Sequence, residues 1–303
     1  MVPMRRLARA VTVPLLAFAL VVSAACASLQ RAPARASDGP ALWVVRDADS
    51  TIYLFGTVHV MKPAAQWRTP RIAAALAASD ELVLEIVEVD QPDALMPAIQ
   101  RYGLDLKTRL SSKLTPAENA RLAAAARSMN LDPAGFEPMR PWLAGLQLVV
   151  GALTRAGYDP SAGVDRLLKA EALAAGKRVT ALETVEQQLG FFGSLPPEVE
   201  LTLLRESLDD FDQAAGVFDP LAEGWLRGDL RTLERYMVRD WKDDAPVLYR
   251  VLLVQRNETW ARQIEEKLKG SGTSFVAVGA GHLVGPDSLQ AQLRRRGIES
   301  ARH

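Results

Sequence analysis

Residues 51–63, TIYLFGTVHVMKP, and residues 273–286, TSFVAVGAGHLVGP, follow the same pattern. Each begins with a β-type apolar run, continues with Gly-x-x-His and reaches a proline four residues after the histidine. Short runs of this composition predict strands, and residues just past a strand commonly form ligand sites in open α/β sheets. The repeated pattern therefore predicts two strands that carry His59 and His282 to one site.

The rest of the chain alternates β-type runs with helical patterns, which favours an α/β fold. We expect a mixed central sheet built from two pseudo-repeated halves, with a large helical insertion, in one domain over residues 41–302. A hairpin is predicted at the Asp-Ala-Asp-Ser segment of residues 47–50. The other predicted strands are 41–46, 81–89 and 177–182, and the predicted helical stretches are 71–79, 92–175, 185–269 and 286–297.

Residues 1–26 have the pattern of a secretory signal peptide. Three early arginines precede an apolar run over residues 11–22, and small residues then lead to Cys26. A lone cysteine in this position resembles a bacterial lipobox, so we expect Cys26 to be acylated and to anchor the chain in a membrane. Residues 27–40 then form a tether, and the protein belongs to the bacterial cell envelope, outer-membrane or periplasm-facing. Ordinary signal cleavage after Ala27 is the alternative.

The composition excludes several classes of protein. Thirty-six basic residues balance thirty-six acidic ones, so no basic excess indicates nucleic-acid binding. A single cysteine excludes a disulfide framework and a cysteine zinc site. Apart from the terminal His303, His59 and His282 are the only histidines. We expect a peptide or small-molecule substrate.

Two glutamates are candidates for the same site. Glu85 lies within the apolar run LVLEIV, where a buried carboxylate is costly unless it is paired or metal-bound. Glu183 follows the predicted strand at 177–182. The alternatives are a solvated Glu85 on an edge strand and a Glu183 that only begins a helix.

Three more polar residues are candidates for substrate contacts. Asn257 lies on a helix whose apolar residues place it facing inward, where it needs polar partners. Arg140 precedes Pro141 and is either a cation of the site or a charge flanking a helix. Asp165 is a further candidate, although a carboxylate at a helix N-terminus explains it equally well.

Two histidines with one or two carboxylates suit a divalent transition metal that keeps an open coordination position. We therefore expect Mn²⁺, Co²⁺ or Zn²⁺ to be bound by His59, His282, Glu85 and Glu183. Such an ion activates water for hydrolysis. A metal-free route is also open, in which His59 acts as general base and Glu85 orients it.

The chain resembles the TraB/GumN family, which is related to the Tiki proteases that act on Wnt ligands. The resemblance rests mainly on the paired Gly-x-x-His motifs and the glutamate strand. It implies a manganese- or cobalt-type metalloprotease site containing His59, Glu85 and His282, with Arg140 or Asn257 as catalytic polar partner. Looser relatives include erythromycin esterase and a haem-binding lipoprotein. The supporting motifs are LWVV, YLFGTVHV, ELVLEIVEV, Arg140-Pro141-Trp142, Gly163-Val164-Asp165, Leu182-Glu183-Thr184 with Gln187, Arg256-Asn257 and VGAGHLVG.

Three functions fit these observations. The first is a lipid-anchored metal-dependent hydrolase of the cell envelope, acting as a peptidase. The second is a binding lipoprotein that holds haem or a small ligand without reaction. The third is a structural partner in an envelope assembly.

Overall fold

The computed structural model describes residues 39–88 and 91–303. The predicted signal peptide, Cys26 and the predicted tether up to residue 38 lie outside these residues. Within them, no helix is both long and apolar enough to cross a membrane.

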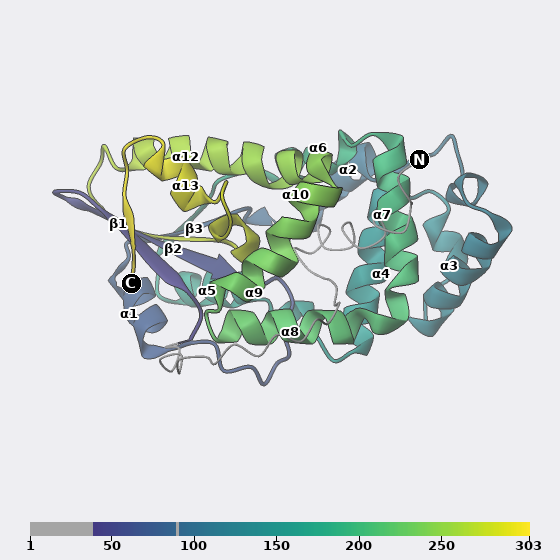
Figure 1. The fold of residues 1–303 in the computed structure, drawn as a ribbon, viewed down its shortest axis with the longest axis horizontal. Coiled ribbons are helices and arrows are strands. Elements are labelled where there is room, and N and C mark those ends of the chain that lie inside the picture. Colours follow the sequence, from purple (N-terminus) through teal and green to yellow (C-terminus); the bar gives the residue numbers. More distant parts are fainter. Residues whose placement is uncertain (1–38, 89–90) are drawn as a thin grey trace.

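A six-stranded mixed sheet forms one end of the molecule, with strand order β4-β3-β5-β2-β1-β6 (Figure 1). The strands β4, β3, β5 and β2 are mutually parallel, whereas β1 pairs antiparallel with β2 in the predicted hairpin. The short β6, antiparallel to β1, was not expected from the sequence. The strands are β1 (Leu42–Arg46), β2 (Ser50–Thr57), β3 (Glu81–Leu84), β4 (Arg178–Ala181), β5 (Gly272–Gly279) and β6 (Ser300–Arg302).

Residues on both faces of the central strands are buried, because helices cover both faces of the sheet. On one face, Leu54 and Val276 pack against Trp260 of α12 and against α13. On the other, Phe55 and Phe275 belong to a larger core that includes α1, α5 and α8. The covering helices are α1 (Pro70–Ala78), α5 (Val164–Ala174), α8 (Ala214–Leu226), α12 (Gln255–Lys267) and α13 (Leu289–Arg294).

A second core lies at the end of the molecule away from the sheet, among α3, α4 and α7 (Figure 1). A capping box at Thr115 and Glu118 begins α3, and Pro141 begins α4. The remaining helices connect this core to the sheet. The bounds of these helices and of those in the second core are α2 (Pro92–Tyr102), α3 (Pro116–Ser128), α4 (Pro141–Arg155), α6 (Val185–Gly193), α7 (Pro197–Asp209), α9 (Leu230–Glu234), α10 (Asp240–Asp244) and α11 (Pro246–Tyr249). The short turns between them are the 3₁₀ turns η3 (Leu110–Lys113), η4 (Pro133–Phe136), η5 (Pro160–Ala162), η6 (Phe211–Gln213) and η9 (Ala280–Leu283), and the π-helical turns η7 (Arg235–Arg239) and η8 (Arg250–Val254).

The structure confirms an α/β fold with a mixed sheet and corrects some of its details. Strand β3 ends at Leu84, so Glu85 lies just past the strand and not in its middle. Since β3 lies between β4 and β5, the edge-strand alternative for Glu85 is wrong. Helices fill both the β3–β4 and the β4–β5 connections. The pseudo-repeat of two halves stays a prediction, although β2 and β5 are adjacent and parallel.

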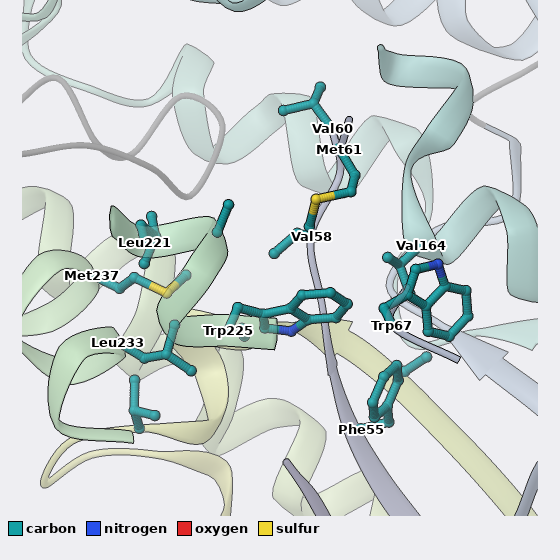
Figure 2. Packing of buried hydrophobic residues seen from close by; sticks show 14 of the residues in the cluster. Phe55, Val58, Val60, Met61, Trp67, Val164, Leu221, Trp225, Leu233 and Met237 are labelled. Atoms are coloured by element: carbon teal, nitrogen blue, oxygen red, sulfur yellow. The ribbon is translucent and has the colours of Figure 1, made fainter. Parts of the chain in front are cut away.

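Trp225 of α8 holds the carboxyl end of β2 in place. Its ring lies near Phe55 and Trp67, with centroids 6.3 and 6.4 Å away (Figure 2). Its indole Nε1–H donates a 2.8 Å hydrogen bond to the carbonyl oxygen of Gly56. This buried bond satisfies a strand carbonyl three residues before His59, where β2 has left its antiparallel partner.

Replacing Trp225 by Phe should destabilise the fold more than the same change at Trp67. Both substitutions shorten a buried ring, but only Trp225→Phe leaves the buried Gly56 carbonyl without a donor. We expect an additional loss of about 1–3 kcal/mol in the free energy of unfolding, measured by urea denaturation. Equal losses for the two variants would show that this hydrogen bond contributes nothing.

Candidate functional site

The four parallel strands end at one edge of the sheet, and each delivers a side chain there. Glu85 follows the last residue of β3 directly. His59 and Glu183 stand two residues past β2 and β4, and His282 three residues past β5. The structure thus brings together the four residues that the sequence patterns predicted for one site, since parallel strands share their carboxyl edge.

The guanidinium of Arg256, in the first turn of α12, lies between these side chains. Its Nη2 donates to Oε2 of Glu85 at 2.6 Å and to Oε2 of Glu183 at 2.9 Å, and its Nε donates to Glu183 at 3.0 Å. Its Nη1 lies 3.3 Å from the Leu252 carbonyl oxygen and 3.2 Å from Nε2 of His282. All five guanidinium N–H groups are engaged in this way.

Burial makes these contacts electrostatically strong. Arg256, Glu85 and Glu183 are each less than a tenth exposed. Burial alone would raise the pKa of Glu85, but Arg256 and the Gly279 N–H, 2.6 Å from Oε1, hold that pKa well below its usual range. Burial raises the pKa of Glu183 in spite of Arg256. Burial works against the Arg256 charge, but the two carboxylates raise its pKa, so it stays cationic.

His282 is held as a neutral imidazole. The Oδ1 of Asn257 lies 2.7 Å from its Nδ1, and the Asn257 amide nitrogen donates to the Asp287 carbonyl oxygen at 2.9 Å. Nδ1–H of His282 therefore donates a hydrogen bond to Asn257, and the Nε2 lone pair accepts one from the Arg256 N–H. Burial and the nearby Arg256 charge lower the pKa of His282 to about 3.

His59 has the opposite environment, because α5 presents a carboxylate to it. The Gly163 backbone packs so closely that a Cβ there would lie 2.4 Å from the His59 carbonyl oxygen. Next along the chain, the N–H of Val164 donates to the Val58 carbonyl oxygen at 2.9 Å, and Oδ1 of Asp165 meets Nδ1 of His59 at 3.0 Å. Burial opposes the charge on His59, but Asp165 raises its pKa to about 9.

The side chains converge over Gly279. A Cβ on Gly279 would lie 3.1 Å from Oε1 of Glu85 and 3.7 Å from both Nε2 of His59 and Cδ2 of His282. The two imidazoles are therefore at most twice that distance apart. Glycine is needed here because a side chain would fill the space in which the three groups meet.

A pocket of about 150 Å³ opens at this point. His59 reaches it with a side chain that is 35% exposed and with an Nε2 that has no partner among the described residues. Gln188 of α6 also lines it and donates to Oε2 of Glu85 at 3.0 Å. The other lining residues are Glu85, Leu146, Leu189, Phe192, Met237, Trp241, Leu252, Leu253, Arg256, Gly279, Gly281 and His282.

Two of the predicted catalytic residues have other surroundings. Arg140 does not line this pocket; it pairs with Glu200 and donates to the carbonyl oxygens of Tyr102 and Gly193 at 3.1 Å. Asn257 supports His282 from behind, with both ends of its amide engaged. Neither side chain is placed to contact a substrate in the pocket.

Arg256 and Asp165 make contacts in the site that were not predicted from the sequence. Arg256 is three residues after Leu253 and four before Trp260, so it falls on the same buried helix face that placed Asn257 inward. That spacing is the feature of the sequence that indicates an inward-facing Arg256. Asp165, and not Glu85, contacts Nδ1 of His59.

The expected metal does not fit this arrangement. Both oxygens of Glu183, Oε2 of Glu85 and Nε2 of His282 face the permanently charged Arg256, which repels a second cation. Across residues 39–88 and 91–303, no group of three or more His, Cys, Asp and Glu side chains is arranged to hold a metal ion. The guanidinium occupies the position that a shared ion would need.

The fold and the site together define an α/β protein with a histidine- and glutamate-lined site at the carboxyl edge of its sheet. The model of the TraB/PrgY/gumN family matches residues 41–302. The chain belongs to this family.

Two relatives extend this finding. An uncharacterised protein of Treponema pallidum (strain Nichols) is 22% identical over 271 residues, which cover 84% of this chain and 80% of that protein. Metalloprotease TIKI1 of Danio rerio is 26% identical over 310 residues. That match covers 85% of this chain and 62% of TIKI1, so the chain spans less than two thirds of that protein.

The two site histidines should titrate far apart. With three histidines in the chain, ring signals in an NMR pH titration are assignable from single substitutions. We expect His59 to lose its proton near pH 9 and His282 to remain neutral down to about pH 3. Asp165→Asn should lower the pKa of His59 and leave His282 unchanged. Coincident titration of both rings near pH 6.5 would contradict these assignments.

Arg256→Met should be strongly destabilising in a pH-dependent manner. It leaves Glu85 and Glu183 buried without a counter-charge, at a cost of about 3–5 kcal/mol near pH 7. Uncompensated burial raises the pKa of both carboxyl groups in the folded variant above their pKa in the unfolded chain. The loss of stability is therefore smallest below the unfolded-state pKa, and it grows as the pH rises through the folded-state pKa. Chemical denaturation at pH 4 and 7 measures it.

Arg262→Met on the exposed side of the same helix is the control, and it should cost little at either pH. An Arg256→Met deficit that does not change with pH would mean that the carboxylates are not what the guanidinium compensates.

Proposed function

We propose that this protein is a hydrolase that cleaves a peptide bond or a related carboxyl derivative in the pocket beside His59. The observation that carries the proposal is the geometry of His59. Its Nδ1 is fixed by Asp165 at 3.0 Å, while its Nε2 is open to the pocket. A carboxylate that orients one nitrogen and leaves the other toward substrate is the arrangement of a general base. Family membership and the likeness to TIKI1, a named metalloprotease, support hydrolysis.

In the proposed reaction, Nε2 of neutral His59 takes a proton from water while the water oxygen attacks the carbonyl carbon. Asp165 and Glu85 stabilise the imidazolium that forms, as the raised pKa of His59 indicates. The imidazolium then gives its proton to the leaving amine or alcohol as the carbon–nitrogen or carbon–oxygen bond breaks. Protons and charge balance, and His59 returns to its neutral form.

Gln188 and Arg256 have different parts in this scheme. One N–H of the Gln188 amide is directed to Glu85, and the other is available for the developing oxyanion. Arg256 has no N–H to spare, so it acts through Glu85 and His282 as a positioning residue. Its charge also adds a positive potential beside the site, which favours negative charge on the reacting carbonyl.

The haem-carrier alternative lacks support from the pocket. A pocket of about 150 Å³ has the size that holds one benzene-sized group. A haem carrier needs a wide slot, and a pocket of this volume does not supply one. We retain the proposal that the chain works in the bacterial cell envelope through acylated Cys26, which rests on the sequence pattern of residues 1–26 alone.

The pH dependence of hydrolysis tests the role of His59. On a library of synthetic peptides and p-nitrophenyl esters, kcat/KM should rise with pH and level off near 9, where the base becomes neutral. Asp165→Asn should reach its plateau at lower pH and with a lower maximum. His59→Ala should lose about 10²–10⁴-fold. A rate that falls between pH 7 and 9 would refute the general-base role.

A chelator tests whether a metal takes part. Because Arg256 occupies the centre of the expected ligands, we expect EDTA to leave kcat/KM unchanged. A loss that Mn²⁺, Co²⁺ or Zn²⁺ restores would instead show that an ion displaces the guanidinium when substrate binds. His282→Ala should then abolish the restoration.

A further inference from the structure

We propose that the pocket selects a peptide in which one residue next to the cleaved bond carries a single bulky apolar side chain, aliphatic or aromatic. This specificity rests on the proposed function for its reaction, but its binding contacts can be tested without turnover. The argument comes from the wall of the pocket that faces the catalytic side chains.

The pocket has two chemically different sides. The side formed by the sheet edge is polar and carries His59, Glu85 and His282. The rest of the lining comes from helices and, apart from Gln188 of α6 and the fully paired Arg256 of α12, it is apolar. The apolar lining is Leu146 of α4, Leu189 and Phe192 of α6, Met237 of η7, Trp241 of α10, and Leu252 and Leu253 of η8.

The apolar wall packs closely against its neighbours. A Cβ on Gly281 would lie 3.1 Å from Cε of Met237 and 3.8 Å from Cδ2 of Leu253, and a Cβ on Gly285 would lie 2.7 Å from Cγ1 of Val238. The π-helical turns η7, through Met237 and Val238, and η8, through Leu253, therefore pack onto the loop that carries His282. Phe192 is fixed by stacking on Trp142, with ring centroids 5.1 Å apart. A wall held in this way selects by size and polarity.

The size of the pocket limits what it accepts. About 150 Å³ suits one branched aliphatic or benzene-sized group and is too small for a larger hydrophobic group to enter whole. A charged side chain among these apolar residues would lose its hydration, and the N–H groups of Arg256 are already engaged. The one open donor of the pocket is Nε2 of His59, which is cationic only below about pH 9. Burying an apolar side chain is favourable for the same reason that it is in a core.

Trp241 extends the apolar wall. Its side chain is buried, and its indole N–H is closed to water-sized groups and has no acceptor among the described residues. The ring therefore contributes apolar surface to the pocket and not a donor for the ligand.

The test measures binding of N-acetyl amino-acid amides to the full chain, followed through the NMR signals of the His59 and His282 rings. The leucine and phenylalanine amides should bind at least about tenfold more tightly than the glycine amide. Above pH 9, where His59 is neutral, the aspartate and lysine amides should bind no better than glycine. Equal affinities, a preference for a charged amide, or no binding of any amide would overturn the proposal.

Matched variants show which part of the pocket produces the preference for apolar amides. Leu189→Asn places an amide in the wall at a half-buried position and should abolish the preference for leucine over glycine. Leu173→Asn on the exposed side of α5 should leave that preference unchanged. A Leu189→Asn protein that keeps the preference would show that the apolar group binds elsewhere.

Cleavage of a randomised peptide library separates this proposal from the proposed function. Enrichment of Leu, Ile, Met or Phe at one position flanking the cleaved bonds supports both. Cleavage without such enrichment overturns the specificity and leaves the hydrolase. Selective binding of the apolar amides without any cleavage supports the specificity and counts against the hydrolase.

Discussion

The buried guanidinium of Arg256 is the interaction on which the site depends. It joins the ends of β3, β4 and β5 through Glu85, Glu183 and His282, and it comes from a helix that packs on one face of the sheet. Two buried carboxylates at one sheet edge would repel each other without it. The positive charge therefore permits the acidic cluster, keeps Glu85 ionised and His282 neutral, and leaves His59 as the group with a free ring nitrogen.

Much of this arrangement was accessible from the sequence because strand ends have a clear signature. The β-type runs located five of the six strands. The residues after them identified His59, Glu183 and His282, whereas Glu85 was identified as a carboxylate inside an apolar run. The short β6 escaped because its three residues carry too little pattern. Strand β3 was predicted too long, since the apolar run continues past Leu84 although pairing with β5 stops there.

The partners of the site residues were harder to predict, since they depend on which helices meet the sheet. Arg140 and Arg256 both lie near the start of a helix, and local sequence does not tell which one reaches the strand ends. In the structure Arg140 pairs with Glu200 of α7, far along the chain from either histidine motif. Similarly, only the close packing of Gly163 against the His59 backbone shows why Asp165 accompanies that ring.

The position of β5 has a consequence for the order in which the protein assembles. This strand lies between β2 and β3, although it comes almost 200 residues after β3 in the chain. An N-terminal fragment that ends before Gly272 lacks the common neighbour of these strands and has neither His282 nor its loop. The complete sheet and the site therefore form only after β5 has been synthesised, and contacts of such sequence separation are intrinsically slow to form. Until then the apolar strands β2 and β3 each lack the neighbour that they share, so premature collapse or aggregation is a hazard of this topology.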